Sequence, residues 1–255
     1  MAGVSWWDSR NTQRKSLPLS NTLQLDYKVK VPELHQLPVK FVPSQNWQKC
    51  PPLLAIDVGA NKGRFTRELL KVYPNLEVHL FEPSKTNVQI LNEAFMNSPN
   101  CKIVPAGLSN VSTQATLYSN QPGSGLGSLT KRKLDHFNID FKFTESIQLI
   151  RFDEYWVENL SQRPIDFIKL DIEGHELDAL EGMVDALKKT RIVQFEFGGC
   201  NIDTRTFFQD YWFFFRERGF DLYRVTALGP IRIKKYSERL EYFTATNYVA
   251  VSKKP

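Results

Sequence analysis

From residue 53 onward, short apolar segments alternate with amphipathic segments of helix length, and this alternation restricts the fold more than any other feature. Strand–helix–strand units of this kind are right-handed, and repeated units build a parallel sheet with helices on both faces. The expected strands are residues 53–58, 76–81, 101–105, 165–172, 192–197 and 242–251, and the expected helices are residues 64–73, 85–96, 177–188 and 206–218. The sequence therefore predicts an α/β domain over residues 53–255.

Residues 1–52 differ from this domain in composition. They hold six of the 14 prolines, and their seven Lys and Arg against three Asp and Glu give +4 of the net charge of +5. Proline removes a backbone donor and restricts the residue before it, so we expect an extended, basic arm. Its apolar side chains indicate packing on the domain or on a second copy, which makes a homodimer through the arm a hypothesis.

Composition and cysteine usage narrow the class of protein. No apolar run approaches the roughly 20 residues that span a bilayer, and the first residues lack the apolar core of a signal peptide. Cys50, Cys101 and Cys200 are too far apart to indicate a disulfide framework or a zinc knuckle. Residues 53–255 carry a net charge of only +1. Nucleic-acid binding usually requires basic clusters interleaved with aromatic residues on one face. We expect a cytoplasmic protein that neither inserts into membranes nor binds nucleic acid.

An insertion at residues 111–156 interrupts the alternation. It contains a predicted hairpin, with strands at residues 115–118 and 147–152, that would act as a lid. The segment 123–127 has three glycines in five residues, which is typical of a mobile loop. Lys131, Arg132 and Lys133 follow, and we interpret them as a solvated basic face that could steer an anionic acceptor.

The first strand ends in a glycine turn, Asp57–Gly63, and the second ends in Glu82. In a parallel sheet, ligands bind at the carboxyl ends of the strands, where a turn opening a helix favours anions and an acid can accept ribose hydroxyls. The turn lacks the Gly-x-Gly-x-x-Gly of dinucleotide sites, and Asp57 would repel a diphosphate. The same acid suits an ammonium and a sulfonium, so the pattern favours S-adenosyl-L-methionine.

A second cluster of titratable residues follows the strand at 165–172. Asp171, Glu173, His175 and Glu176 fall within six residues, and Glu196 ends the next strand. His175 is the candidate base for a hydroxyl acceptor, with a bystander role as the alternative. Asp171, Glu173 and Glu196 could orient the base, hold the cofactor ammonium or bind the acceptor. The acids could also bind a divalent cation such as magnesium, although no adjacent pair favours this. We interpret Glu176 as stabilising the start of the next helix.

The chain from residue 53 resembles the FkbM family of S-adenosylmethionine-dependent methyltransferases. The resemblance rests on the motifs at residues 57–63, 81–83, 106–110, 166–176 and 194–198. It implies a Rossmann-like class I methyltransferase fold, with a mostly parallel sheet of seven strands whose last is antiparallel. It also implies O-methylation of a hydroxyl group of a sugar, a glycan, or a glycosylated or polyketide natural product, with the adenine near Gly107 and Leu108. The residues expected to bind the cofactor are Asp57, Gly59, Ala60, Asn61, Gly63, Glu82, Pro83, Gly107, Leu108 and Asp171.

Two other functions remain open at this point: a nicotinamide-dependent reductase, and a non-catalytic relative that binds a nucleoside or a glycan. The sequence does not identify the acceptor, which we expect to be a small molecule or a glycan.

Overall fold

The computed structural model describes residues 53–253, so the arm at residues 1–52 and the homodimer hypothesis lie outside the described residues. The helices are α2 (Arg64–Val72), α3 (Lys85–Phe95), α4 (Phe152–Leu160), α5 (Glu176–Glu181), α6 (Val184–Leu187), α7 (Cys200–Thr204) and α8 (Phe208–Glu217). The strands are β1 (Leu54–Val58), β2 (Glu77–Phe81), β3 (Cys101–Val104), β4 (Gly107–Leu108), β5 (Thr113–Ser119), β6 (Phe143–Ile150), β7 (Ile165–Leu170), β8 (Thr190–Phe197), β9 (Phe220–Thr226), β10 (Gly229–Ile233) and β11 (Thr246–Ser252).

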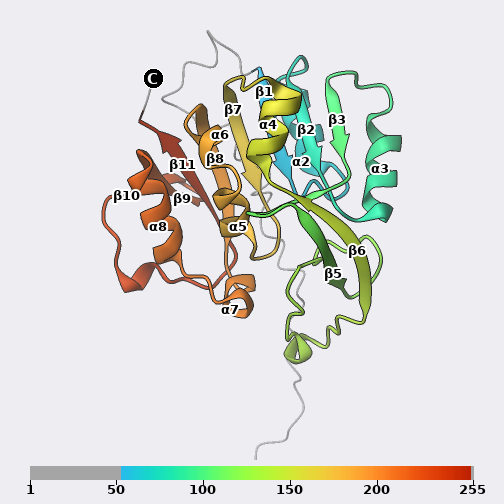
Figure 1. The fold of residues 1–255 in the computed structure, drawn as a ribbon. Helices are drawn as coiled ribbons and strands as arrows, with labels where there is room; N and C mark the ends of the chain where they lie inside the picture. The colour runs from blue at the N-terminus through green and yellow to red at the C-terminus, as the bar shows by residue number, and fades with distance from the viewer. Residues whose placement is uncertain (1–52, 254–255) are drawn as a thin grey trace, which may run out of the picture. The chain divides into compact units, whose positions relative to one another are not determined.

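Eight strands form one sheet in the order β10-β9-β11-β8-β7-β1-β2-β3 (Figure 1). The five strands from β3 to β8 in this order are parallel. β11 lies antiparallel between β8 and β9. The predicted Rossmann-like sheet, mostly parallel with an antiparallel last strand, is therefore confirmed. The alternation of the sequence did not predict β10, which pairs with β9 at the edge and makes the eighth strand.

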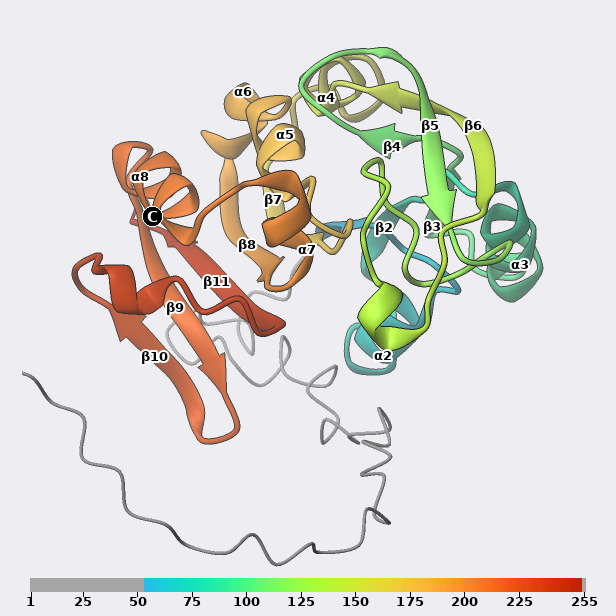
Figure 2. The same cartoon turned by 90° about the horizontal axis from the view of Figure 1, so that it is seen from below.

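Helices cover both faces of this sheet, as expected. α4, α5, α6 and α8 lie on one face and α2 on the other (Figure 2). The first face buries one apolar cluster that includes Trp156, Leu180 and Phe215. The second buries another, in which Leu69 of α2 and Leu91 of α3 meet the sheet. Each fully buried side chain of this size contributes about 1.5–3 kcal/mol, so both layers hold the carboxyl ends of the strands in place.

The insertion supplies β5 and β6 of a separate sheet of three strands, in the order β4-β6-β5, and β4 comes before the insertion in the chain. β5 and β6 are the predicted hairpin and pair antiparallel from Thr113 opposite Leu149 to Ser119 opposite Phe143. The second strand ends at Ile150, two residues before the expected end, and Phe152 begins α4 instead. Phe152 is fully buried in the first apolar cluster, so packing against the large sheet favours the helix.

The helix expected at residues 177–188 is divided into α5 and α6. Gly182 lies at the break, and a Cβ there would overlap the carbonyl oxygen of Ser109. The close approach of this second backbone segment explains why the helix stops. Among the described residues, no helix has the length and apolar character needed to cross a bilayer.

Candidate functional site

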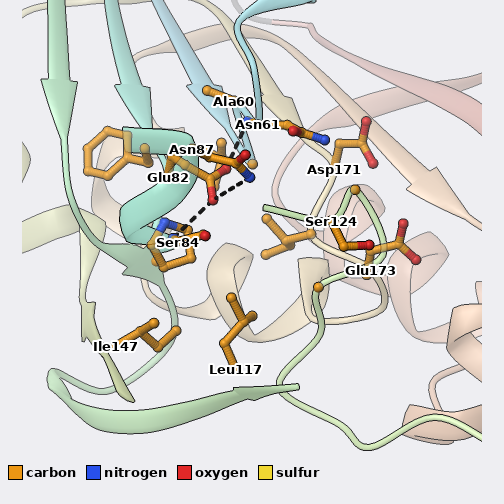
Figure 3. Close-up of a pocket in the computed structure, with 18 of the residues that line it drawn as sticks. Ala60, Asn61, Glu82, Ser84, Asn87, Leu117, Ser124, Ile147, Asp171 and Glu173 are labelled. Atoms are coloured by element: carbon orange, nitrogen blue, oxygen red, sulfur yellow. Dashed lines mark hydrogen bonds between the residues drawn. The ribbon is translucent and has the colours of Figure 1, made fainter. Parts of the chain in front are cut away.

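A cavity of about 490 Å³ opens at the carboxyl ends of β1, β2 and β7. Side chains of β5 and β6 form its opposite wall. Figure 3 shows Glu82 with Ser84 and Asn87 on one side, and Asp171 and Glu173 on the other. The two acidic clusters of the sequence therefore face one cavity.

Glu82 is buried at the end of β2, and protein donors hold both of its carboxylate oxygens. The backbone N–H of Asn61 donates to Oε2 over 2.8 Å, and that of Ser84 donates to Oε1 over 3.0 Å. Asn87 Nδ2 lies 3.4 Å from the same Oε1 (Figure 3). Burial raises the pKa of Glu82 above its usual value, against these hydrogen bonds. The carboxylate keeps further lone pairs on both oxygens for a ligand.

Three buried polar atoms around Glu82 have no hydrogen-bond partner among the described residues. They are Asn61 Oδ1, Ser84 Oγ and Asn87 Oδ1, and all three residues line the cavity. A buried polar atom without a partner costs about 1–3 kcal/mol. Their concentration here indicates a polar ligand that supplies the missing partners.

The glycine turn holds these groups through its own backbone. Gly59 has φ +75°, and its N–H and that of Ala60 both donate to the carbonyl oxygen of Phe81. Gly63 has φ +73° and donates to the carbonyl oxygen of Ala60. The N–H groups of Gly59, Ala60 and Gly63 already donate to protein carbonyl oxygens. Fewer backbone donors of the turn are therefore left to bind an anion than the sequence predicted. Gly59, Ala60 and Asn61 line the cavity, whereas Gly63 does not and instead packs against α3.

Asp57 lies behind the cavity wall, in contrast to the expectation that it meets the cofactor. It is fully buried, and its Oδ2 accepts a hydrogen bond of 2.6 Å from Thr66 Oγ1. Its Oδ1 lies 3.8 Å from Nζ of Lys169, which does line the cavity. Burial raises the pKa of Asp57 above its usual value. Lys169 therefore stands between this carboxylate and the ligand space.

Lys169 also pairs with Asp171, Nζ to Oδ2, over 3.0 Å. Burial opposes the charged ammonium, but Asp171 and Asp57 raise the pKa of Lys169, so the side chain stays cationic. Sequence reasoning did not single out this lysine. Its position at the end of the strand expected at residues 165–172, two residues before Asp171, was the available signal, because side chains i and i+2 of a strand share a face.

Glu173 has φ +55° and forms an ion pair of 2.6 Å with Nη1 of Arg132, whose Nε also contacts Asp203 Oδ2 at 3.2 Å. Burial raises the pKa of Glu173 to about 7 despite the arginine. The expectation of a solvated basic face fails at Arg132, whose side chain is only 10% exposed. The two flanking lysines, Lys131 and Lys133, are exposed as expected.

Glu176 and Glu196 lie outside the cavity lining. Glu176 is fully buried and accepts backbone hydrogen bonds from Ile172 and Gly174, at 2.8 and 3.1 Å, so it closes the turn after β7. Burial raises its pKa to about 7. Burial, and next the charge of Asp171, raises the pKa of Glu196 well above its usual value. Glu196 is thus placed to act on a ligand only through Asp171.

His175 lines the cavity and is held from two sides. Its Nδ1 lies 2.9 Å from Asp178 Oδ2, and its Nε2 lies 3.0 Å from Thr130 Oγ1. With the proton on Nδ1, the ring donates to the carboxylate and accepts the Thr130 hydroxyl at Nε2. In this tautomer Nε2 is an acceptor that already binds a hydroxyl group. No sequence pattern pointed to Thr130, which comes from the insertion.

Apolar residues and glycines enclose the rest of the cavity. Leu108 and Gly107 line it near Pro83, and a Cβ at Gly107 would come within 2.8 Å of Leu149. The glycine-rich segment 123–127 also lines it, and a Cβ at Gly123 would come within 2.9 Å of Asn87. This segment is therefore packed against the Glu82 cluster. Among residues 53–253, no three His, Cys, Asp or Glu side chains form a group that could hold a metal ion.

Comparison with known families finds a match over the domain. Residues 57–222 match the methyltransferase FkbM domain, which is more than half of the 255 residues. The match includes the glycine turn, Glu82, the insertion and the segment from Asp171 to Glu196.

Two curated proteins are distant relatives. The 2-O-methyltransferase NoeI of Sinorhizobium fredii (strain NBRC 101917 / NGR234) is 24% identical over 156 residues, covering 58% of this chain and 64% of NoeI. Methyltransferase 1 of Beauveria bassiana (strain ARSEF 2860) is 23% identical over 147 residues, covering 51% of this chain and 58% of that protein. The chain thus spans about three fifths of the length of these relatives.

Solved structures of methyltransferases also align with the chain. Methyltransferase FkbM from Methylobacillus flagellatus KT aligns with a TM-score of 0.48 and 17% identity, covering 78% of this chain and 43% of that one. A TehB-like SAM-dependent methyltransferase from Corynebacterium glutamicum ATCC 13032 aligns with a TM-score of 0.42 and 14% identity, covering 81% and 84%.

Proposed function

The chain belongs to the FkbM methyltransferase family, and on that premise we propose that it transfers a methyl group from S-adenosylmethionine to a hydroxyl group of a sugar, glycan or polyketide natural product. The observation that carries this proposal is the cluster of Glu82 and three unpartnered polar atoms in a cavity at the strand ends. The distant likeness to a protein named as a 2-O-methyltransferase supports oxygen as the acceptor atom.

The residues around Glu82 fit the nucleoside part of this cofactor. The carboxylate can accept both ribose hydroxyls, since Glu82 lines the cavity and each oxygen keeps a lone pair beside its protein donor. Ser84 Oγ and the Asn87 and Asn61 amide oxygens offer hydrogen bonds to the nucleoside. Leu108 and the other apolar lining residues suit the faces of an adenine ring. When bound, S-adenosylmethionine supplies an electrophilic methyl group on a sulfonium.

Asp171 and Glu173 lie on the other side of the cavity, where positive groups of the cofactor would be placed. Asp171 is partly exposed and lines the cavity. Its carboxylate, which already pairs with Lys169, can also attract the ammonium group of the cofactor. Glu173 is already engaged by Arg132. We therefore assign the cofactor's amino group to Asp171 and a supporting role to Glu173.

His175 is the base in this proposal. With its ring proton on Nδ1, Nε2 accepts the Thr130 hydroxyl, and an acceptor hydroxyl in the place of Thr130 would give its proton to the same nitrogen. The methyl carbon would then form a bond to the acceptor oxygen as its bond to the cofactor sulfur breaks, and S-adenosylhomocysteine would be the leaving group. Asp178 holds Nδ1 and stabilises the resulting imidazolium. Asp178 is a positioning residue, because it acts through His175.

Calorimetric titration with S-adenosylhomocysteine tests the proposal. We expect binding by the wild-type chain and no binding of NAD. Glu82→Gln keeps the shape but removes the charge, so it should weaken binding roughly 10- to 100-fold, the value of a hydrogen bond to a charged group. Glu93→Gln is the matched control, because Glu93 is exposed on the helix that follows Glu82. Binding of NAD but not S-adenosylhomocysteine would instead support a nicotinamide-dependent reductase.

A screen with labelled S-adenosylmethionine against glycans and hydroxylated metabolites tests the catalytic step. Methylation that depends on His175 supports the proposed transferase. Tight binding of S-adenosylhomocysteine without methylation of any acceptor would favour a non-catalytic binding protein.

A further inference from the structure

Three cations stand at the rim of the cavity. Lys62, Arg64 and Arg67 all line it and are all exposed. None of them has an ion pair or hydrogen bond with another described residue through its charged group. Arg64 and Arg67 are three residues apart on α2, so they share one face of the helix.

The stability of α2 does not explain these cations. Arg64 is the first residue of the helix, and the first turn contains no acid. The amino end of a helix carries a partial positive charge, so acids stabilise it and cations do the reverse. Lys62, Arg64 and Arg67 therefore form a positive cluster at the end of the helix that least favours it. A bound anion would relieve this repulsion.

The acids of the cavity do not neutralise the cluster. Glu82 is held by Asn61, Ser84 and Asn87 as described above. Lys169 lies against Asp171, and Arg132 against Glu173. The fourth lining acid, Glu145, accepts a hydrogen bond of 2.8 Å from the backbone N–H of Lys85. Each lining acid thus has a protein partner, whereas the rim cations have none among the described residues.

We propose that the methyl acceptor carries an oxyanion, a phosphate or a carboxylate, and that Arg64 and Arg67 bind it at the rim of the cavity. This inference rests on the proposed function and names the acceptor's chemical class. The planar arginine fork matches a carboxylate or a phosphate with two parallel hydrogen bonds. The cofactor's own carboxylate needs at most one of the three rim cations, and the single ammonium of Lys62 suffices for it. Two arginines remain for the acceptor.

The test compares sugars that differ in charge. Glucose 1-phosphate, glucuronate and glucose are titrated against the chain by NMR at matched ionic strength, with and without S-adenosylhomocysteine. We expect the two anionic sugars to bind at least about tenfold more tightly than glucose, because hydrogen bonds to charged groups are the stronger ones. The phosphate and carboxylate arms identify which oxyanion the site prefers.

Arg64→Gln/Arg67→Gln should abolish the preference for charged sugars, while the Kd for S-adenosylhomocysteine stays within about twofold. Lys234→Gln/Lys235→Gln is the matched control, since it removes two exposed cations outside the cavity lining. The inference is overturned if all three sugars bind equally, if the arginine variant keeps the preference, or if that variant loses S-adenosylhomocysteine instead. A wild-type chain that binds no S-adenosylhomocysteine contradicts the proposed function, while the titrations without it still test the arginines.

Discussion

Burial sets the protonation of the acids that follow β7. Glu173 and Glu176 both have a pKa raised to about 7, mainly because the protein interior disfavours their charged forms. A carboxyl with a pKa of 4.5 in the unfolded chain and about 7 in the folded one binds its proton more tightly when folded. Its contribution to stability is complete below the unfolded pKa and is lost as the pH rises through 7.

We therefore predict that the free energy of unfolding decreases between about pH 5 and pH 7, within the window set by the shifted pKa values of Glu173 and Glu176. Glu176→Gln should remove up to about 3 kcal/mol of this decrease, since one pKa unit corresponds to about 1.4 kcal/mol. Urea unfolding at pH 5, 6, 7 and 8 measures it. A variant whose pH profile runs parallel to that of the wild type would contradict the assignment.

Substitution of two glycines with similar φ angles distinguishes the cost of backbone strain from the cost of steric overlap. Gly59 has φ +75° and Gly219 has φ +83°. A Cβ at Gly59 would overlap the carbonyl oxygen of Asp171, whereas a Cβ at Gly219 meets nothing within 4 Å. We predict a cost of about 1–2 kcal/mol for Gly219→Ala, from φ alone, and more than about 4 kcal/mol for Gly59→Ala. Equal costs in urea unfolding would show that the turn has room for a side chain.

For single residues, the sequence predicted which kinds of side chain form the site better than it predicted which of them face the cavity. Glu82, Asp171 and Glu173 do line one cavity, because parallel strands end at the same edge. Asp57 was expected there too, but Lys169 lies on its cavity side. Which of two neighbouring groups faces a ligand depends on side-chain packing across strands, and strand patterns do not contain that information.

At the scale of elements, hydrogen bonds and an ion pair join the insertion to the segment after β7. Ser128 Oγ donates to the carbonyl oxygen of Glu173 over 2.9 Å, and the next contacts along the loop are those of Thr130 and Arg132. Three alternate residues of one loop therefore hold the turn that carries Glu173 and His175. The sequence predicted the hairpin but not these contacts between the loop and the turn, since the residues in contact are more than 40 positions apart in the chain.

Removing the arginine should loosen this junction. Arg132→Gln leaves the side chains of Glu173 and Asp203, 17% and 18% exposed, without their cation. Breaking a buried pair in this way costs about 3–5 kcal/mol, so the melting temperature should fall by roughly 6–20 °C. Lys133→Gln is the control, because it removes the same charge from an exposed neighbour. A melting temperature equal to that of the control would mean that the pair contributes nothing to stability.

At the scale of the whole domain, the sequence predicted the layered architecture. The alternation from residue 53 produced five parallel strands and helices on both faces, because buried strands and amphipathic helices have distinct apolar periods. It did not predict β10 or the pairing of β4 with β6. These short strands carry little periodicity of their own, and they form where neighbouring strands offer a free edge.

The nucleoside of the cofactor should bind with its ribose on Glu82 and its base against the wall that contains Leu108 and Ile147. A crystal structure of the chain with S-adenosylhomocysteine tests it most directly. We predict both ribose hydroxyls within hydrogen-bond distance of the Glu82 carboxylate and the amino acid end directed toward Asp171. A ligand seated outside this cavity, or one whose ribose does not contact Glu82, would contradict the account.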